Sequence, residues 1–386
     1  MKILHYKPTI RLEEGGVVRA VLDLCTEMAK AGHAVTLATG DATDVPAAWK
    51  AGEPGCPTLL HTPLSGNPTR TDPVRRAIAD ADIVHLHAVW QPDNLRFARA
   101  CLNAGTPYVV SIHGMLDDWT IAQKHLKKRL FLALGGGRFL ARAAAVHTTA
   151  EAERDQARKW IGGAHAEVVP LLFDLADFAE LPGASPAIAK FPQIDRDVPR
   201  LLFLSRVHEK KGVHRLLRSA AILRDRGVPF QLLIAGTGDE PYVSRVRALR
   251  DQLELQNHAE FLGFVSGIEK VSLYQASTLF VLPTSQENFG FVYFEALASG
   301  CPVVTTKGTD TWPEIEQSGG GVIASGEPEP FADAIGALLA EGESAIHDRG
   351  RRARRWTLDY FQPERIVAAY EALYARAART KGKDPA

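Results

Sequence analysis

Residues 201–212 read LLFLSRVHEKKG and show the pattern on which the whole chain is built. The apolar run 201–204 fits a buried strand, and Gly212 stands where that strand would turn into a helix. Apolar residues at helical spacing follow, namely Val213, Leu216, Leu217, Ala220 and Ala221. A strand, a glycine-bearing turn and a helix together make one unit of a parallel sheet with crossover helices.

The same alternation recurs along the chain. In the first half, short apolar runs predict strands at residues 2–6, 34–39, 83–87, 108–112 and 144–148. In the second half, they predict strands at residues 201–205, 231–235, 259–262, 279–283, 303–305 and 321–324. We therefore expect an α/β fold of two Rossmann-like, doubly wound parallel-sheet domains.

The length of 386 residues fits two domains of roughly 150–200 residues each. Residues 181–199 hold four prolines and show little periodicity, so we expect them to link a first domain, 1–180, to a second, 200–362. A last helix is predicted at residues 363–380, and we expect it to pack back on the first domain.

The composition and the ends of the chain exclude several classes of protein. Lys and Arg number 45 and so do Asp and Glu, so the net charge does not point to a nucleic-acid partner. The four cysteines lie far apart without a CxxC pair, which favours reduced thiols over disulfides or a zinc site. Residues 2–6 begin directly as a strand, and no run approaches the ~20 apolar residues of a membrane span. We expect a cytoplasmic protein.

Arg206 and Lys211 are the first candidate binding residues. They stand at a strand-to-helix turn, where backbone N–H groups and basic side chains favour a phosphate or diphosphate. The alternative is a solvated, basic start of a helix. Cations at a helix N-terminus oppose the helix dipole, however, so the fold alone does not require them.

Residues 287–295, ENFGFVYFE, form the second candidate group. Glu287 lies in the expected loop after a strand, and Glu295 lies about one turn into the next helix. Carboxylates accept hydrogen bonds from hydroxyls, including those of sugars and ribose. The alternative for Glu295 is a surface acid, but its neighbours are apolar and an unpaired acid would be costly there. Cations for a diphosphate and acids for hydroxyls together indicate a nucleotide-sugar.

With these motifs in this order, nearly the whole chain resembles the retaining glycosyltransferases of family 4, the glycosyl transferases group 1. That family has the GT-B fold, in which two Rossmann-like domains face each other across a cleft. The resemblance implies transfer of a sugar from a UDP-sugar or GDP-sugar to an acceptor hydroxyl, with no metal ion. It also implies a glycan or lipid-linked glycan acceptor, as in cell-surface polysaccharide synthesis.

The resemblance assigns donor-side roles as follows: Arg206 and Lys211 on the diphosphate, Glu287 with the backbone of Phe289, Gly290 and Phe291 on the sugar, and Glu295 on the ribose. It makes His113, which ends an expected strand, a contact of the sugar near the reacting carbon. Arg206, Lys211, Glu287 and His113 are therefore the expected catalytic residues. His87 and Trp90, at a similar strand end, are expected to line the acceptor pocket.

Three glycine-bearing loops are further donor-side candidates. Gly15 and Gly16 open a helix and face the donor in the family, although a plain strand–helix turn fits them as well. Gly236 lies in AGTGD, which is not a dinucleotide fingerprint because Pro241 replaces its third glycine. By the resemblance this turn lies beside the nucleotide, and the loop with Phe264 reads the base. A P-loop motif is absent, which excludes that class of NTPase.

Two segments leave their alternatives open. The domain junction reads VPLLFD at 169–174 and lacks the Asn-Gly that the family often shows there. This difference changes the expected hinge turn and bears on the acceptor side and domain closure, not on the donor site. The basic, leucine-bearing stretch 124–142 fits either a peripheral contact with an anionic membrane face or a solvated helix. Rival functions on the same architecture are an epimerase, a phosphorylase and an inactive nucleotide-binding homologue. The sugar, the base and the acceptor are not determined by the sequence.

Overall fold

The computed structural model describes residues 1–63 and 65–379, which divide into two compact units. The first unit comprises residues 1–173 and the described residues from Phe361 onward, and the second comprises Asp174–Tyr360. Residues 181–199, expected as a linker, belong to the second unit. There α9 (Ser185–Lys190) packs against α12 (Gly267–Ala276), and the Ala187 N–H donates to the Ser272 hydroxyl at 2.9 Å. In the described residues, no helix combines the length and apolarity needed to cross a membrane.

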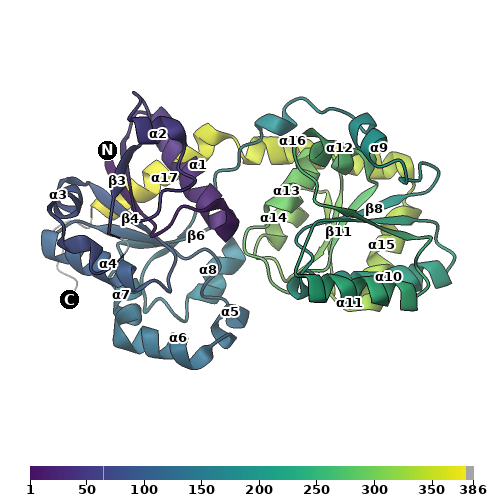
Figure 1. Ribbon diagram of the computed structural model, residues 1–386, viewed down its shortest axis with the longest axis horizontal. Coiled ribbons are helices and arrows are strands. Elements are labelled where there is room, and N and C mark those ends of the chain that lie inside the picture. Colours follow the sequence, from purple (N-terminus) through teal and green to yellow (C-terminus); the bar gives the residue numbers. More distant parts are fainter. Residues whose placement is uncertain (64, 380–386) are drawn as a thin grey trace. The chain divides into compact units, whose positions relative to one another are not determined.

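A parallel sheet of seven strands forms the centre of the first unit (Figure 1). Its spatial order is β3 (Thr58–His61), β2 (Ala34–Thr39), β1 (Lys2–Tyr6), β4 (Ile83–His87), β5 (Tyr108–Ser111), β6 (Ala145–Thr148) and β7 (Ala166–Val168). Five of these strands match the sequence prediction. The other two, β3 and β7, lie at the edges and have no fully buried side chain, so they lack the apolar run that marks a strand.

Helices cover both faces of this sheet. Their bounds are α1 (Gly16–Lys30), α2 (Ala47–Ala51), α3 (Asp72–Asp80), α4 (Pro92–Ala104), α5 (Asp118–Ala122), α6 (His125–Phe131), α7 (Gly137–Ala141), α8 (Glu151–Ala157) and α17 (Pro363–Ala378). One face packs its core against α3, α4 and α7. Helices α1 and α17 pack on each other, and α17 contacts β4 and β5. Thr380, the last residue expected in α17, lies outside the described residues.

A parallel sheet of six strands forms the centre of the second unit. Its order is β10 (Ala259–Gly263), β9 (Gln231–Ala235), β8 (Arg200–Leu204), β11 (Leu279–Leu282), β12 (Val303–Thr306) and β13 (Gly321–Ala324). All six match the predicted strands, which confirms the expected pair of doubly wound parallel sheets. The order reverses between β8 and β11, and ligands bind at the carboxyl ends of strands at such a switch point.

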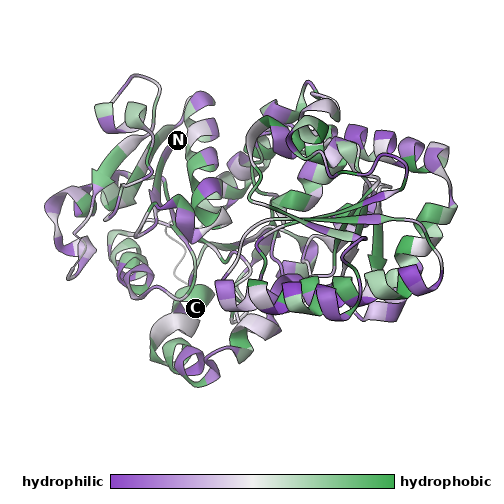
Figure 2. Ribbon diagram, turned by 45° about the vertical axis from the view of Figure 1, so that its right-hand side comes forward, coloured by the Kyte–Doolittle hydropathy of each residue, from purple (hydrophilic) through white to green (hydrophobic). Residues whose placement is uncertain are grey.

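The helices of the second unit also form two layers (Figure 1). Helices α10 (Val213–Asp225), α11 (Glu240–Gln252) and α15 (Pro328–Ala340) lie on one side of the sheet, and the other side carries α9, α12, α13 (Phe291–Ala298), α14 (Trp312–Gln317) and α16 (Glu343–Tyr360). Hydrophobic and hydrophilic bands alternate along many of these helices, as amphipathic helices on a buried sheet require (Figure 2).

The second face of the first sheet carries an unusual set of buried polar residues, which we call the histidine layer: His5, His85, His87, His113 and His147. Strand residues alternate between faces, and the register places His5 opposite His85, and Ser111 between His87 and His147. Helix α17 covers the layer, since the Tyr374 hydroxyl lies 2.7 Å from His85 Nδ1 and the Tyr370 hydroxyl lies 3.3 Å from His147 Nε2.

This layer should make the first unit sensitive to acid. Burial lowers the pKa of His5 to about 3 and that of His147 to about 4, so both stay neutral in the folded protein at pH 5. In the unfolded chain a histidine has its ordinary pKa of about 6.5 and binds a proton below that pH. Each histidine that stays neutral in the folded protein therefore lowers the free energy of unfolding by up to about 1.4 kcal/mol for every pH unit below 6.5. We expect unfolding stability to fall from pH 6.5 to pH 5, a window above most carboxylate titration.

Denaturant unfolding at a series of pH values measures this slope. His85→Phe should reduce the slope, whereas His347→Gln, at an exposed histidine of the second unit, should leave it unchanged. Equal stability of the wild-type protein at pH 6.5 and pH 5 would contradict the prediction.

Candidate functional site

The turn after β8 is docked on the end of β11. The Lys210 carbonyl accepts hydrogen bonds from the Ser285 N–H at 2.8 Å and from the Thr284 hydroxyl at 3.1 Å. Gly212 has φ +75°, and a Cβ there would lie 2.2 Å from the Pro283 carbonyl oxygen. A side chain at position 212 would push the two segments apart, so this glycine allows the close approach.

This approach brings Lys211 and Glu287 into an ion pair. The Lys211 side chain is only 11% exposed and that of Glu287 only 23%. Burial lowers the pKa of the Lys211 ammonium to about 7, and the neighbouring Arg206 and Lys210 cations act in the same direction. The Glu287 carboxylate opposes them, because an adjacent negative charge favours the protonated amine. Two residues 76 positions apart in the sequence thus share one site.

Arg206 lies in the same turn and is exposed. Among the described residues, it has no ion-pair or hydrogen-bond partner. Its planar guanidinium is therefore available to an anionic ligand beside Lys211.

The loop that follows Glu287 is held rigidly. The Glu287 N–H donates to the Gly308 carbonyl at 2.7 Å, and its own carbonyl accepts from the Asp310 N–H at 3.0 Å. Phe289 is buried, and Gly290 has φ +67° immediately before α13. Phe291, the first residue of α13, packs its ring against that of Phe289. The backbone of Phe289, Gly290 and Phe291 therefore has a fixed position at the carboxyl end of β11.

Glu295 lies on α13 and is paired with α12. Its carboxylate accepts from Lys270 Nζ at 2.7 Å and from the Tyr274 hydroxyl at 3.0 Å. Burial and the Glu295 charge together raise the pKa of Tyr274, so the phenol stays protonated and donates. The structure thus places Glu295 in a pair of its own, separate from the contact between Lys211 and Glu287.

Close backbone packing explains why glycines follow β9. A Cβ at Gly236 would lie 1.9 Å from the Ser205 carbonyl oxygen, and one at Gly238 would lie 1.9 Å from that of Val207. The β9 turn thus rests directly on the backbone of the β8 turn, which explains the G-x-G pattern without a dinucleotide. The Gly236 N–H also donates to the Gly263 carbonyl at 2.7 Å. Phe264, next in the chain, is 72% exposed, so its ring is open to a ligand.

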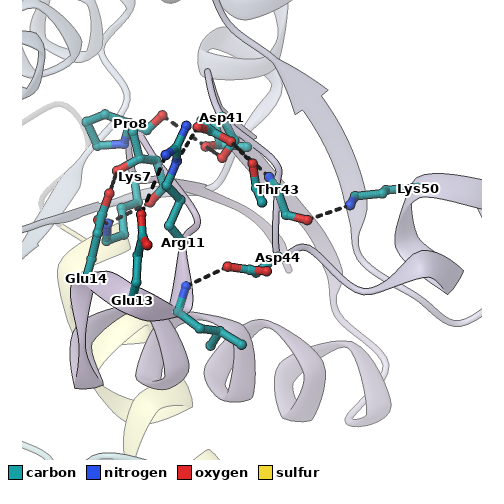
Figure 3. A network of polar contacts seen from close by, with 12 residues as sticks. Lys7, Pro8, Arg11, Glu13, Glu14, Asp41, Thr43, Asp44 and Lys50 are labelled. Carbon is teal, nitrogen blue, oxygen red and sulfur yellow. Dashed lines mark hydrogen bonds and ion pairs between the residues drawn. The ribbon is translucent and has the colours of Figure 1, made fainter. Parts of the chain in front are cut away.

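In the first unit, the loop before Gly15 and Gly16 is fixed by a polar network (Figure 3). Buried Lys7 donates to the Glu14 carboxylate at 2.6 Å, and Arg11 Nε donates to Asp41 at 2.6 Å. Gly15 has φ 107° and ψ −162°, a conformation essentially limited to glycine, and Gly16 starts α1. Gly15 is therefore required at least by the turn itself.

His113 occupies a strained backbone position with φ +48°. The next residue, Gly114, donates its N–H to Glu153, a buried carboxylate that also accepts from the Thr149 hydroxyl at 2.8 Å. Holding a non-glycine residue in this conformation costs of order 1–3 kcal/mol, and such strain clusters at functional sites. Burial lowers the pKa of His113 to about 3, helped by His147 and Lys7, so its ring is neutral.

His87 and Trp90 differ in their surroundings. His87 is buried, with Nδ1 3.2 Å from His113 Nε2. Trp90 is half-buried and packs edge-on against Phe131 of α6, with Lys128 Nζ 5.1 Å from its ring centre. The two proposed acceptor residues thus face different neighbours.

Sequence reasoning missed four residues that the structure brings to this edge of the first sheet: His5, Lys7, His147 and Glu153. The signal for the histidines was present in the alternation of His85 and His87, but joining them to His5 requires the strand register. Nitrogen atoms of His5, His85 and His87 lie within 4.8 Å of one another, which makes these three the candidate metal ligands in the described part of the chain. The sequence analysis did not predict a set of metal ligands here.

Two protein-family models match the chain. Residues 185–356 match the model of the glycosyl transferases group 1, and residues 15–171 match that of the glycosyl transferase 4-like domain. Together the two models span both units of the fold.

Curated relatives include glycosyltransferases that are named for inositol compounds. The phosphatidyl-myo-inositol mannosyltransferase of Mycobacterium leprae is 28% identical over 345 residues, which cover 84% of each chain. The D-inositol 3-phosphate glycosyltransferase of Corynebacterium urealyticum is 33% identical over 150 residues. That match spans 37% of this chain and only 35% of the relative.

Solved structures share the whole architecture. HepE from Anabaena, solved in complex with UDP, superposes with a TM-score of 0.77 at 20% identity and covers 97% of this chain and 100% of HepE. Sucrose-phosphate synthase from Thermosynechococcus elongatus gives a TM-score of 0.72 at 19% identity, covering 97% and 98%.

The packing of the β9 turn on the β8 turn predicts that a side chain at position 238 destabilises the second unit. Because a Cβ there would meet the Val207 carbonyl at 1.9 Å, Gly238→Ala should destabilise the second unit by about 1–3 kcal/mol. The matched control is Gly336→Ala within α15, where the nearest atom to a Cβ lies at 3.8 Å. That control should stabilise by roughly 0.5–1 kcal/mol, because alanine loses less entropy in a helix. Denaturant unfolding of both variants measures the difference, and equal stabilities would refute the packing explanation.

Proposed function

We infer the function of this chain from its family, since it belongs to the glycosyl transferases group 1 and is a glycosyltransferase with the GT-B fold. The family and the fold expected from the sequence are thereby confirmed. What the family leaves open is the donor, the stereochemical outcome and the residues that perform the transfer.

We propose that the enzyme moves a sugar from a nucleoside-diphosphate sugar to an acceptor hydroxyl, with retention at the reacting carbon. The observation that carries this proposal is the Lys211–Glu287 pair beside Arg206, at the switch point between β8 and β11. Two cations suit a diphosphate and a carboxylate suits sugar hydroxyls, and this edge of a doubly wound sheet is where such ligands bind.

In this proposal Arg206 and Lys211 stabilise the charge that develops on the leaving nucleoside diphosphate. Fixed charges aimed at a developing anion lower the barrier because they need no reorganisation during the reaction. The departing phosphate oxygen accepts the proton of the attacking hydroxyl on the same face of the sugar. Glu287 and the backbone of residues 289–291 hold the sugar, and His113 is assigned a contact near the reacting carbon. No metal ion is assigned a role.

The nucleoside is assigned to Glu295 and Phe264. Glu295 would accept from the ribose hydroxyls, and the exposed ring of Phe264 offers a face on which a base could stack. Lys270 and Tyr274 already orient the Glu295 carboxylate. HepE was solved with UDP, and a relative from Mycobacterium tuberculosis is named for its dependence on GDP-mannose, so UDP- and GDP-sugars are the donors to test.

A transfer assay with Lys211→Ala tests the proposal. Release of free nucleoside diphosphate should require the acceptor, and the product should keep the anomeric configuration of the donor. Lys211→Ala should lower kcat by roughly 10²–10³, the usual loss when a group that stabilises developing charge is removed. Lys210→Ala removes a cation from the same turn without touching Glu287 and should stay near wild type. Wild-type turnover by a folded Lys211→Ala protein would exclude the diphosphate role.

We further propose that α6 and the segment after it bring the enzyme to an anionic membrane face, where a lipid-linked acceptor would lie. Leu126, Leu130 and Leu134 are 82%, 58% and 74% exposed and follow one another at four-residue spacing. Residues 121–145 contain six Lys and Arg and no acid. Exposed leucines beside a run of cations fit a helix that lies in the headgroup region of anionic lipids.

Vesicle sedimentation tests this surface. The wild-type protein should bind vesicles that contain phosphatidylglycerol and should bind pure phosphatidylcholine vesicles far less. A triple variant with Leu126→Ser, Leu130→Ser and Leu134→Ser should lose most of this binding. Leu102→Ser, at another exposed leucine of the first unit, serves as the control. Undiminished vesicle binding by the triple variant would rule out the surface.

A further inference from the structure

Three histidines of the histidine layer form a row. His5 Nδ1 lies 3.1 Å from His87 Nε2, and His87 Nδ1 lies 3.2 Å from His113 Nε2. Ring centres are 5.4 Å and 5.5 Å apart, with interplanar angles of only 15° and 24°. Nearly coplanar rings at these separations meet edge to edge, so both contacts are in-plane N–H···N hydrogen bonds.

This geometry does not suit a metal ion. Zinc lies about 2.0–2.1 Å from an imidazole nitrogen, so it does not fit between two nitrogens that point at each other across 3.1 Å. His85, the third candidate ligand, has both nitrogens engaged, by Tyr374 at 2.7 Å and by Ser111 at 2.6 Å. The row is a hydrogen-bonded chain of imidazoles.

Each ring in the row carries a single proton at neutral pH. Burial lowers the pKa of His5 and His113 to about 3 and that of His87 well below its ordinary value. A neutral imidazole donates through one nitrogen and accepts through the other. The three tautomers are therefore coupled, and only two arrangements make both hydrogen bonds.

The two arrangements differ at the ends of the row. The end atoms, His5 Nε2 and His113 Nδ1, are buried and have no hydrogen-bond partner among the described residues. In one arrangement His5 Nε2 carries an unpaired N–H, and in the other it is a bare acceptor while His113 Nδ1 carries the N–H. Each arrangement therefore leaves one unpaired N–H and one bare acceptor. Because unpaired buried N–H groups are rare in proteins, the favoured arrangement is the one whose N–H lies at the end where a ligand can accept from it.

We propose that His5 and His87 are positioning residues, which hold His113 in the tautomer with its proton on Nδ1. His113 then presents a hydrogen-bond donor at the ligand end of the row. For its ligand, this inference rests on the proposed function, in which His113 contacts the donor sugar, and the group it would serve is a sugar oxygen that accepts a hydrogen bond. At the other end of the row, the buried His5 Nε2 then carries a lone pair and no proton.

Two neighbours bear on this assignment. Lys7 is a cation near His113 and by itself would favour a lone pair on the histidine, but its ammonium is paired with Glu14 at 2.6 Å and with the Thr9 carbonyl at 2.6 Å. The strained backbone of His113 is fixed through Gly114 and Glu153, so the ring has little freedom to turn away from His87.

The test begins with the wild-type protein labelled with ¹⁵N at histidine. The ring nitrogen shifts should report His113 with a protonated Nδ1 and with Nε2 as an acceptor. A protonated Nε2 at His113 would overturn the inference without any substitution.

Variants then separate positioning from structure. His87→Phe removes the donor that holds the tautomer, so His113 should show a mixture of tautomers and kcat should fall about tenfold with little change in donor KM. Ser111→Ala breaks hydrogen bonds to His85 and His147 in the same layer but leaves the row intact, so both signals should stay as in the wild type. An unchanged His113 tautomer together with unchanged kcat in His87→Phe would also overturn the inference.

The two proposals fail in different ways. If no donor and acceptor give transfer but His113 is protonated on Nδ1, the proposed function falls and the tautomer assignment stands. If transfer occurs while His113 is protonated on Nε2, the proposed function stands and this inference falls.

Discussion

The arrangement of candidate site residues in the second unit depends on the contact between the turn after β8 and the end of β11. It depends on backbone atoms, since the Lys210 carbonyl binds the Ser285 N–H and Gly212 rests against the Pro283 carbonyl. Such contacts tolerate little change, because no side chain can shorten to relieve a clash between backbones. This contact brings Lys211 to Glu287. A second backbone contact places the β9 turn on the β8 turn. The ion pair is a consequence of the turn packing.

The first unit depends on a buried polar layer. Five imidazoles lie buried on one face of its sheet, and their burial destabilises the fold unless they stay neutral and form hydrogen bonds to one another, to tyrosine or to serine. A polar core of this kind specifies which hydroxyl faces which ring, so it positions side chains more narrowly than an apolar core would. That makes the layer a precise support for His113 at the edge of the sheet.

The sequence predicted eleven of the thirteen strands in the described residues, the two parallel sheets and the family, because short apolar runs and two spaced motifs are local signals. It missed β3 and β7, whose side chains are not fully buried, and it treated residues 181–199 as a linker although α9 packs on α12. It could not assemble the histidine layer, because His5, His87 and His113 become neighbours only through strand order and register. It related Gly236 to the nucleotide alone, whereas the structure adds a backbone contact that no spacing rule reveals.

The return of α17 to the first unit has a consequence for how the protein is made. During synthesis, residues 1–173 leave the ribosome before Tyr370 and Tyr374 exist, so His85 and His147 lack these hydroxyl partners until the second unit has been made. The second unit, Asp174–Tyr360, is continuous and holds all its own elements. Domains of nascent chains generally fold from the N-terminus onward. Here the N-terminal unit cannot be completed until α17 has followed the second unit out of the ribosome.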